Sequence, residues 1–132
     1  NYLFSDIRMK IQIASDLHTE HGHHSPALAL TDAEVIVLAG DIGIGTHGID
    51  WAADLSHDHG KPVLYVAGNH EFYYREYRHT LAALRETALK RGVLFLEQDA
   101  VVLGGVRFLG TTLWTDYACN VQVPPDLARW AA

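Results

Sequence analysis

Three short apolar segments of this sequence end in the same way, with two small residues followed by one side chain that carries an oxygen. The three endings are Ala14-Ser15-Asp16, Ala39-Gly40-Asp41 and Ala67-Gly68-Asn69. A histidine, His18, stands two positions after the first of these oxygens. Small residues let backbones approach a common point, and carboxylate, amide and imidazole groups all bind metal ions. The pattern therefore predicts that the three segment ends meet at one metal site.

The charge distribution favours a cation at such a meeting point. Between Ile11 and Gly60 the sequence holds eight acidic residues and no lysine or arginine. Two carboxylates about 4 Å apart repel by roughly 4 kcal/mol at an effective dielectric near 20, so either one is protonated or a cation lies between them. Mixed nitrogen and oxygen ligands favour Mn²⁺, Fe²⁺/Fe³⁺ or Zn²⁺ over Ca²⁺. Asp41, on the middle segment, is the natural bridging ligand for a pair of divalent ions.

The segments that carry these residues have the composition of parallel strands. Residues 10–14, 34–39 and 62–67 are rich in β-branched side chains, and the last two are almost continuously apolar, as in strands buried on both faces. The carboxyl ends of adjacent parallel strands lie along one edge of a sheet, where ligands bind in α/β folds. The order of the elements therefore also predicts that Asp16, Asp41 and Asn69 converge.

The intervening segments are long enough for crossover helices. Apolar residues recur at spacings of three and four in Ile49–His59 and Tyr73–Arg91, and each of these segments is followed by a glycine, Gly60 and Gly92. We also expect a short helical piece at residues 27–32, between the first two strands. Alternating strands and helices favour a parallel sheet with right-handed crossovers.

After the second long helix the pattern changes to short strands. Val93–Leu96, Ala100–Leu103 and Val106–Gly110 predict strands, and Gly104-Gly105 is typical of a two-residue hairpin turn. Residues 111–117 extend the last of them. The prediction is an α/β domain with a parallel first sheet, followed by a β-hairpin that starts a second sheet.

The three blocks of polar residues also form a recognisable series: Asp16-x-His18, then Gly40-Asp41, then Gly68-Asn69-His70-Glu71. This series resembles the calcineurin-like metallophosphoesterase superfamily, whose pattern runs D-x-H, G-D-x-x-D and G-N-H-[DE] before two later histidine blocks. Residues 112–116 are also similar to a segment of small bacterial members. The resemblance covers residues 9 to about 118 and implies the N-terminal part of an αββα sandwich.

The resemblance implies a role for each matching residue. Asp16 and His18 would bind the first of two divalent ions, Asp41 would bridge both, and Asn69 would bind the second. His70 would lie near the leaving-group oxygen as proton donor or phosphate stabiliser, which suits the near-neutral pKa of an imidazole. The implied reaction is hydrolysis of a small phosphomonoester or phosphodiester by metal-bound hydroxide at a di-metal site.

The sequence departs from the family pattern at two places. Ile44 stands where the second aspartate of G-D-x-x-D falls, but that residue is not normally a ligand. No histidine follows His79, so the two later histidine blocks are missing from the sequence. We therefore expect residues 9–132 to be an incomplete metallophosphoesterase domain with weak or no activity of its own. We expect residues 1–8 to be a leader ahead of a native start at Met9.

Two other functions remain open on sequence alone. One is a non-catalytic metal-binding fragment or scaffold, because of the missing histidines. The other is a dinucleotide-binding module that uses Gly43, Gly45 and Gly48, which form a G-x-G-x-x-G series after a strand. Asp41 argues against this module because it would put a carboxylate beside the pyrophosphate. A histidine cluster at 21, 23 and 24 is interpreted as a solvated loop.

The amino-acid composition bears on nucleic-acid binding, on membrane insertion and on the cellular compartment. The net charge of −6 and the absence of a basic segment argue against specific nucleic-acid binding. No apolar run approaches the roughly 20 residues that span a bilayer. A single cysteine, Cys119, cannot form an internal disulfide, which favours the cytoplasm. The sequence leaves the oligomeric state open, homo-oligomers included.

Overall fold

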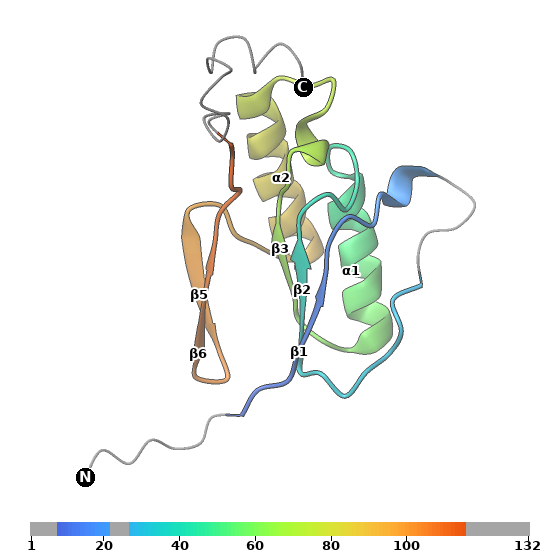
Figure 1. Cartoon of the computed structure of the whole chain (residues 1–132), viewed down its shortest axis with the longest axis vertical. Helices are drawn as coiled ribbons and strands as arrows, with labels where there is room; N and C mark the ends of the chain where they lie inside the picture. Colours follow the sequence, from blue (N-terminus) through green and yellow to red (C-terminus); the bar gives the residue numbers. More distant parts are fainter. Residues whose placement is uncertain (1–7, 22–26, 116–132) are drawn as a thin grey trace, which may run out of the picture.

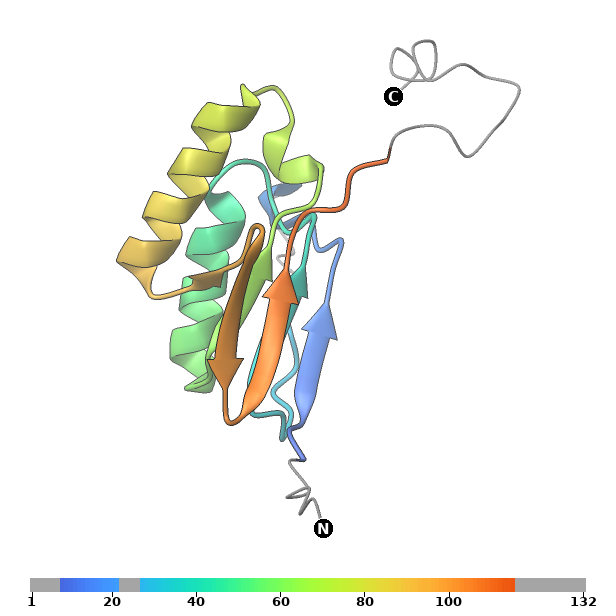
Figure 2. The ribbon, with the colours of Figure 1, turned by 90° about the vertical axis from the view of Figure 1, so that its left-hand side faces the viewer.

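The computed structural model describes residues 8–21 and 27–115, and these form three layers (Figures 1 and 2). Two helices cover one face of a four-stranded parallel sheet, and a two-stranded antiparallel hairpin lies against the other face. The elements are β1 (Ile11–Ala14), η1 (Thr19–His21), β2 (Val35–Ala39), α1 (His47–His59), β3 (Val63–Val66), η2 (His70–Phe72), α2 (Tyr77–Arg91), β4 (Leu94–Phe95), β5 (Asp99–Leu103) and β6 (Val106–Gly110). The predicted fold class, an N-terminal part of an αββα sandwich, is confirmed.

The parallel sheet has the strand order β1-β2-β3-β4, and sequence neighbours are also spatial neighbours. The strands pair in parallel, with Ile13 opposite Val37 and Val37 opposite Leu64. The three strands predicted at 10–14, 34–39 and 62–67 are confirmed to within one residue at each end. Their carboxyl ends consequently share one edge of the sheet.

Both faces of the sheet are covered by apolar side chains. Side chains of β2 and β3 pack with α1 and α2 in one core, whose fully buried members include Ile36, Leu38, Ile49, Val63 and Leu84. A second, smaller core lies between the sheet and the hairpin and contains Val35, Leu64, Leu96, Val101 and Phe108. The almost continuous apolar composition of β2 and β3 follows from this burial on two sides.

The second long helix begins later than the sequence predicts, at Tyr77 instead of Tyr73. The carboxylate of Glu76 caps this helix, since it accepts hydrogen bonds from the backbone N–H groups of Arg78 and His79 at 3.0 and 2.6 Å. These hydrogen bonds hold the pKa of Glu76 below its ordinary value. Tyr74 has φ of 61°, which a helix does not allow. Residues 73–76 therefore lie in a loop, although the apolar spacing of the helix begins within them.

The short helix predicted at 27–32 is wrong, because these residues form no helix in the structure. The side chain of Gln12 on β1 holds this segment instead. Its amide nitrogen donates to the carbonyl of Ala29 at 3.0 Å, and its amide oxygen accepts from the hydroxyl of Thr31 at 2.8 Å. The last part of the connection from β1 to β2 is therefore fastened to the edge strand β1.

The predicted hairpin is confirmed, but its second strand ends at Gly110. Gly104 and Gly105 both have positive φ, 52° and 80°, as a two-residue type I′ turn requires. The predicted extension of the strand over 111–117 is wrong for its described part, because the buried carboxylate of Glu97 accepts hydrogen bonds from the hydroxyl of Thr111 and the N–H of Thr112. Tyr117 lies outside the described residues.

Candidate metal centre

The loops after β1, β2 and β3 are joined by hydrogen bonds at the carboxyl edge of the sheet. The N–H of Asp16 donates to the carbonyl of Gly40 at 3.0 Å, and the N–H of His18 donates to the carbonyl of Asp41 at 3.2 Å. The third loop joins them through the N–H of His70, which donates to Oδ1 of Asp41 at 2.9 Å. The three segment ends therefore meet, as the order of the elements predicts.

Glycine is required where these loops touch. A Cβ on Gly40 would lie 3.0 Å from the Cα of Gly68, and Gly40 also has φ of 94°. A Cβ on Gly68 would lie 2.1 Å from Oδ1 of Asp41 and 2.7 Å from its backbone nitrogen. Real Cβ atoms essentially never show contacts as short as those at Gly68, and the contact at Gly40 is tighter than most. The small residues before Asp41 and Asn69 thus serve the close approach that the sequence analysis inferred for them.

Asp16, His18 and Asp41 each offer a ligand atom, and these three atoms lie within 4.8 Å of one another. Two ligands on one ion lie at most about 4.4 Å apart, since each bond to nitrogen or oxygen is about 2.0–2.2 Å long. Small rotations of the side chains would therefore bring all three atoms onto a single ion. The donor set of two carboxylates and one imidazole fits Zn²⁺, Mn²⁺ or Fe.

The backbone of the same three residues lies in the left-handed region. The φ angles are 55° for Asp16, 46° for His18 and 56° for Asp41. A non-glycine residue in this region costs about 1–2 kcal/mol, and such strain is concentrated at functional sites in proteins. The hydrogen bonds between the loops hold the three residues in this conformation and direct their side chains to one place.

Asn69 lies at the same edge and lines one cavity together with Asp16 and Asp41. Its amide nitrogen donates to the hydroxyl of Tyr73 at 2.9 Å, which leaves the amide oxygen as the atom that suits a cation. The cavity has a volume of about 570 Å³ and lies between the sheet and the end of the hairpin. Its other wall comes from residues 109–113, so the hairpin shapes the space in front of the carboxylates.

Glu71 holds the loops in place, a role that the sequence patterns did not reveal. Its side chain is fully buried, and its carboxylate accepts four hydrogen bonds. The donors are the N–H groups of Asp41 (3.2 Å), Ile42 (2.8 Å) and Gly68 (2.7 Å) and the hydroxyl of Tyr65 (2.7 Å). Glu71 is the last residue of the G-N-H-[DE] block, and this acid in a buried position was the available signal, because a buried carboxylate must find hydrogen-bond donors.

Tyr65 remains a hydrogen-bond donor to Glu71 at all ordinary pH values. Burial, together with the negative charge and hydrogen bond of Glu71, raises the pKa of Tyr65 well above 10. Tyr65 also explains one glycine of the G-x-G-x-x-G series, since a Cβ on Gly48 would lie 2.2 Å from its hydroxyl. A second glycine, Gly45, has φ of 59°, and a Cβ there would lie 2.8 Å from Nε of Arg75. Local backbone conformation and packing therefore account for these two glycines without a dinucleotide.

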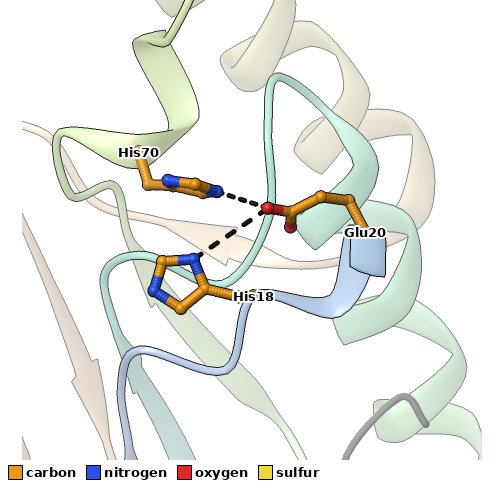
Figure 3. A group of neighbouring side chains, drawn as sticks. All are labelled: His18, Glu20 and His70. Atoms are coloured by element: carbon orange, nitrogen blue, oxygen red, sulfur yellow. Dashed lines mark hydrogen bonds and ion pairs between the residues drawn. The ribbon is translucent and has the colours of Figure 1, made fainter. Parts of the chain in front are cut away.

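His70 is buried beside His18 and contacts a carboxylate that the sequence patterns also missed. The two imidazole rings meet edge to face with centroids 4.2 Å apart. Nε2 of His70 is hydrogen-bonded to Oε1 of Glu20, which lies 3.9 Å from Nδ1 of His18 (Figure 3). Glu20 stands two positions after His18, and this spacing was the only signal for it. His18, Glu20 and His70 form a second group of ligand atoms within 4.8 Å.

The other histidines and Ile44 lie as follows. His79 and His47 are exposed, His79 on α2 and His47 at the start of α1, and Ile44 is half-buried in the loop between β2 and α1. The cluster at 21, 23 and 24 falls almost entirely outside the described residues. Within the described part of the chain, three or more histidine, cysteine or acidic side chains bring ligand atoms within 4.8 Å of one another in two groups, which are the two named above.

Comparison with known families identifies the chain. A family model described as calcineurin-like phosphoesterase matches residues 9–118, most of the sequence. The chain belongs to this family. The match spans all three polar blocks and the hairpin, and the calcineurin-like phosphoesterase fold agrees with the observed layers. A search of curated protein sequences gives no match.

A solved structure also resembles this calcineurin-like phosphoesterase chain. It is phosphopantetheinyl hydrolase (PptH) from Mycobacterium tuberculosis, with 26% sequence identity and a TM-score of 0.57. The similarity covers 71% of this chain but only 37% of PptH. The chain therefore spans little more than a third of the length of that relative.

Proposed function

We propose that this chain carries the metal-binding half of a metal-dependent phosphoesterase site. The observation that carries the proposal is the approach of Asp16, His18 and Asp41, whose ligand atoms lie within 4.8 Å at the carboxyl edge of the sheet. Membership of the calcineurin-like phosphoesterase family supports the same reaction class. No lysine or arginine occurs between Ile11 and Gly60 to balance these carboxylates, and divalent cations would provide that balance.

In this proposal each residue has one task. Asp16 and His18 would hold the first ion, Asp41 would be shared by two ions, and Asn69 would hold the second through its amide oxygen. The hydrogen bond from the N–H of His70 to Oδ1 of Asp41 fixes one carboxylate oxygen. The other oxygen would remain available to the ions. The first ion would have three ligands from the described residues and the second would have two, so we infer that the second would need further ligands from outside residues 8–21 and 27–115.

The chemistry divides between the ions and the side chains. Divalent ions in such a pair lower the pKa of water and stabilise the attacking and leaving oxygens of an in-line displacement. His70 is the proposed proton donor to the leaving-group oxygen, because its ring lies directly against that of the ligand His18. The cavity of about 570 Å³ in front of Asp16, Asp41 and Asn69 has room for a small phosphoester.

The substrate class follows from the cavity and the family. We propose a small phosphomonoester or phosphodiester, and the likeness to PptH is a reason to include phosphopantetheinyl compounds among the substrates to be tested. None of the helices within residues 8–21 and 27–115 is long and apolar enough to cross a membrane. A cytoplasmic location remains a proposal that rests on the single cysteine of the sequence.

The test compares Asp41→Asn with Asp58→Asn, a matched change at an exposed carboxylate on α1. Isothermal titration with Mn²⁺ and Zn²⁺ measures binding, and hydrolysis of p-nitrophenyl phosphate and its diester measures turnover. We expect Asp41→Asn to lose metal affinity and turnover, and Asp58→Asn to retain both. Wild-type affinity and turnover in Asp41→Asn would contradict the proposal.

A second candidate function, a non-catalytic metal-binding scaffold, is favoured by the small number of ligands for the second ion. The same experiment separates the two functions. Binding of one ion that depends on Asp16, His18 and Asp41, with no hydrolysis of any phosphoester by the longest form of the protein, would favour the scaffold.

A further inference from the structure

The contact between Glu20 and His70 links two residues 50 positions apart in the sequence. Oε1 of Glu20 is hydrogen-bonded to Nε2 of His70, and both side chains are largely buried, with 16% and 11% of their side-chain surface exposed. Figure 3 shows this oxygen beside both imidazoles, with a dashed line to one nitrogen of His70 and one of His18. The 3.9 Å from this oxygen to Nδ1 of His18 fits an ion pair but is too long for a hydrogen bond, so of these two histidines His70 is the one that is hydrogen-bonded to Glu20.

His70 is restrained from other sides as well. Its backbone N–H is bound to Asp41, and its ring packs edge-on to His18 with centroids 4.2 Å apart. The ring of Tyr73 also packs against it, with the two ring centroids 4.8 Å apart. Rotation of the imidazole about its bond to Cβ would break the contact with Glu20. Glu20 therefore selects one orientation of the ring.

We propose that Glu20 is the positioning residue of His70, and that it acts by accepting the hydrogen at Nε2. The proposal rests on the proposed phosphoesterase function, in which His70 donates a proton. Because Nε2 of His70 is hydrogen-bonded to Glu20, the ring is held in one orientation, and a proton donor must keep one orientation relative to the group that it serves.

This arrangement explains why a half-buried acid is placed in an already acidic site. A carboxylate hydrogen-bonded to a ring nitrogen holds the imidazole in position, as carboxylates do in metal and catalytic centres. Glu20 does not contact the substrate in this proposal. Its removal should therefore weaken proton donation and leave substrate binding almost unchanged.

The first test needs no activity. Long-range ¹H–¹⁵N spectra of the metal-free full chain report which ring nitrogen of His70 carries the hydrogen, with His70→Asn used for assignment. We expect the neutral ring to carry it at Nε2 in the wild type and in Glu86→Ala, a control at an exposed glutamate on α2. In Glu20→Ala we expect a mixture of both forms. An unchanged spectrum of His70 in Glu20→Ala would overturn the proposal.

The second test uses the dependence of rate on the leaving group. A poor leaving group, as in phenyl phosphate, needs a proton donor, whereas 2,4-dinitrophenyl phosphate does not. We expect Glu20→Ala to lower kcat for phenyl phosphate by about 10–100-fold, with KM nearly unchanged and little effect on the dinitrophenyl ester. Glu20→Gln, which keeps an acceptor oxygen without the charge, should lose less.

A double-variant cycle separates this role from a merely structural one. Because Glu20 acts through His70, Glu20→Ala should add almost nothing to the loss in His70→Ala. Equal losses with both esters, or additive losses in the double variant, would overturn the proposal. If the longest form of the protein, loaded with metal, hydrolyses no phosphoester, the proposed function fails, and the spectra still decide whether Glu20 orients His70.

Discussion

The hydroxyl of Tyr65 on β3 donates a hydrogen bond to Oε1 of Glu71 at 2.7 Å, and both side chains are fully buried. Glu71 is a carboxylate of the centre that cannot serve a cation, since backbone N–H groups and this hydroxyl occupy its oxygens. Its negative charge instead holds the β2 and β3 loops together. The candidate metal centre is therefore supported by a buried acid whose oxygens are already occupied by hydrogen bonds.

Tyr65→Phe should destabilise the protein by about 1.5–3 kcal/mol, the range for a hydrogen bond to a charged group. The aromatic ring keeps its place in the core, so the loss reports the hydroxyl alone. Chemical denaturation measures the change. Tyr74→Phe is the matched control, because Tyr74 is 96% exposed and its substitution should change stability by less than about 0.5 kcal/mol.

The advantage of the wild type over Tyr65→Phe should shrink at alkaline pH. The folded-state pKa of Tyr65 is raised above 10, so this contribution is fully present below the pKa of the unfolded chain, near 10. It is lost as the pH rises from there toward the folded-state pKa, because only the unfolded state ionises. Denaturation of both proteins between pH 8 and about 11 checks the trend. A difference that grows over this interval would reject the interpretation.

Gly68→Ala should damage both stability and metal binding. The new methyl group would overlap Oδ1 and the backbone nitrogen of Asp41, and such overpacking costs about 1–3 kcal/mol. Displacement of Asp41 should lower Mn²⁺ affinity by about 10–100-fold. Gly60→Ala is the control, since Gly60 has φ of 63° and a methyl group there would meet no atom within 4 Å. It should lose about 1–2 kcal/mol from backbone strain alone and bind metal normally.

Asp16→Asn should have opposite effects with and without metal. The ligand atoms of Asp16 and Asp41 lie within 4.8 Å, and removal of one charge relieves a repulsion of about 1 kcal/mol in water-like surroundings. The metal-free variant should therefore melt no lower than the wild type. At a metal concentration about 100 times the wild-type Kd, the wild type gains about 2.7 kcal/mol and the variant gains much less. Differential scanning calorimetry with and without Mn²⁺ distinguishes these cases.

Thr112→Val should loosen the hairpin wall of the cavity. The hydroxyl of Thr112 lies 2.6 Å from Oε2 of Glu97 and 2.8 Å from the carbonyl of Ala67, and all three groups are buried. Loss of the hydroxyl leaves buried acceptors short of a donor, at a cost of about 1–3 kcal/mol. Thr87→Val, at a half-buried position on α2, removes a hydroxyl away from this contact and should cost clearly less. Equal losses in the two variants would count against a special role for Thr112.

Local patterns were sufficient for most of the fold. β-branched runs placed β1, β2 and β3 to within one residue, and the Gly104-Gly105 turn was recognised because two positive φ angles favour glycine at both positions. The helix start at Tyr77 was missed because the cap depends on the carboxylate of Glu76 turning back onto the chain. Apolar spacing continues across such a cap and does not reveal it.

The sequence by itself determined which residues stand at the strand ends, since Asp16, Asp41 and Asn69 each follow a recognisable strand and small residues. Only the tertiary structure decided which acids support that edge and how. Glu71 reaches Asp41 across 30 positions and Glu20 reaches His70 across 50. These pairings depend on how three loops pack and on the side-chain rotamers within them, and no local periodicity encodes such long-range contacts.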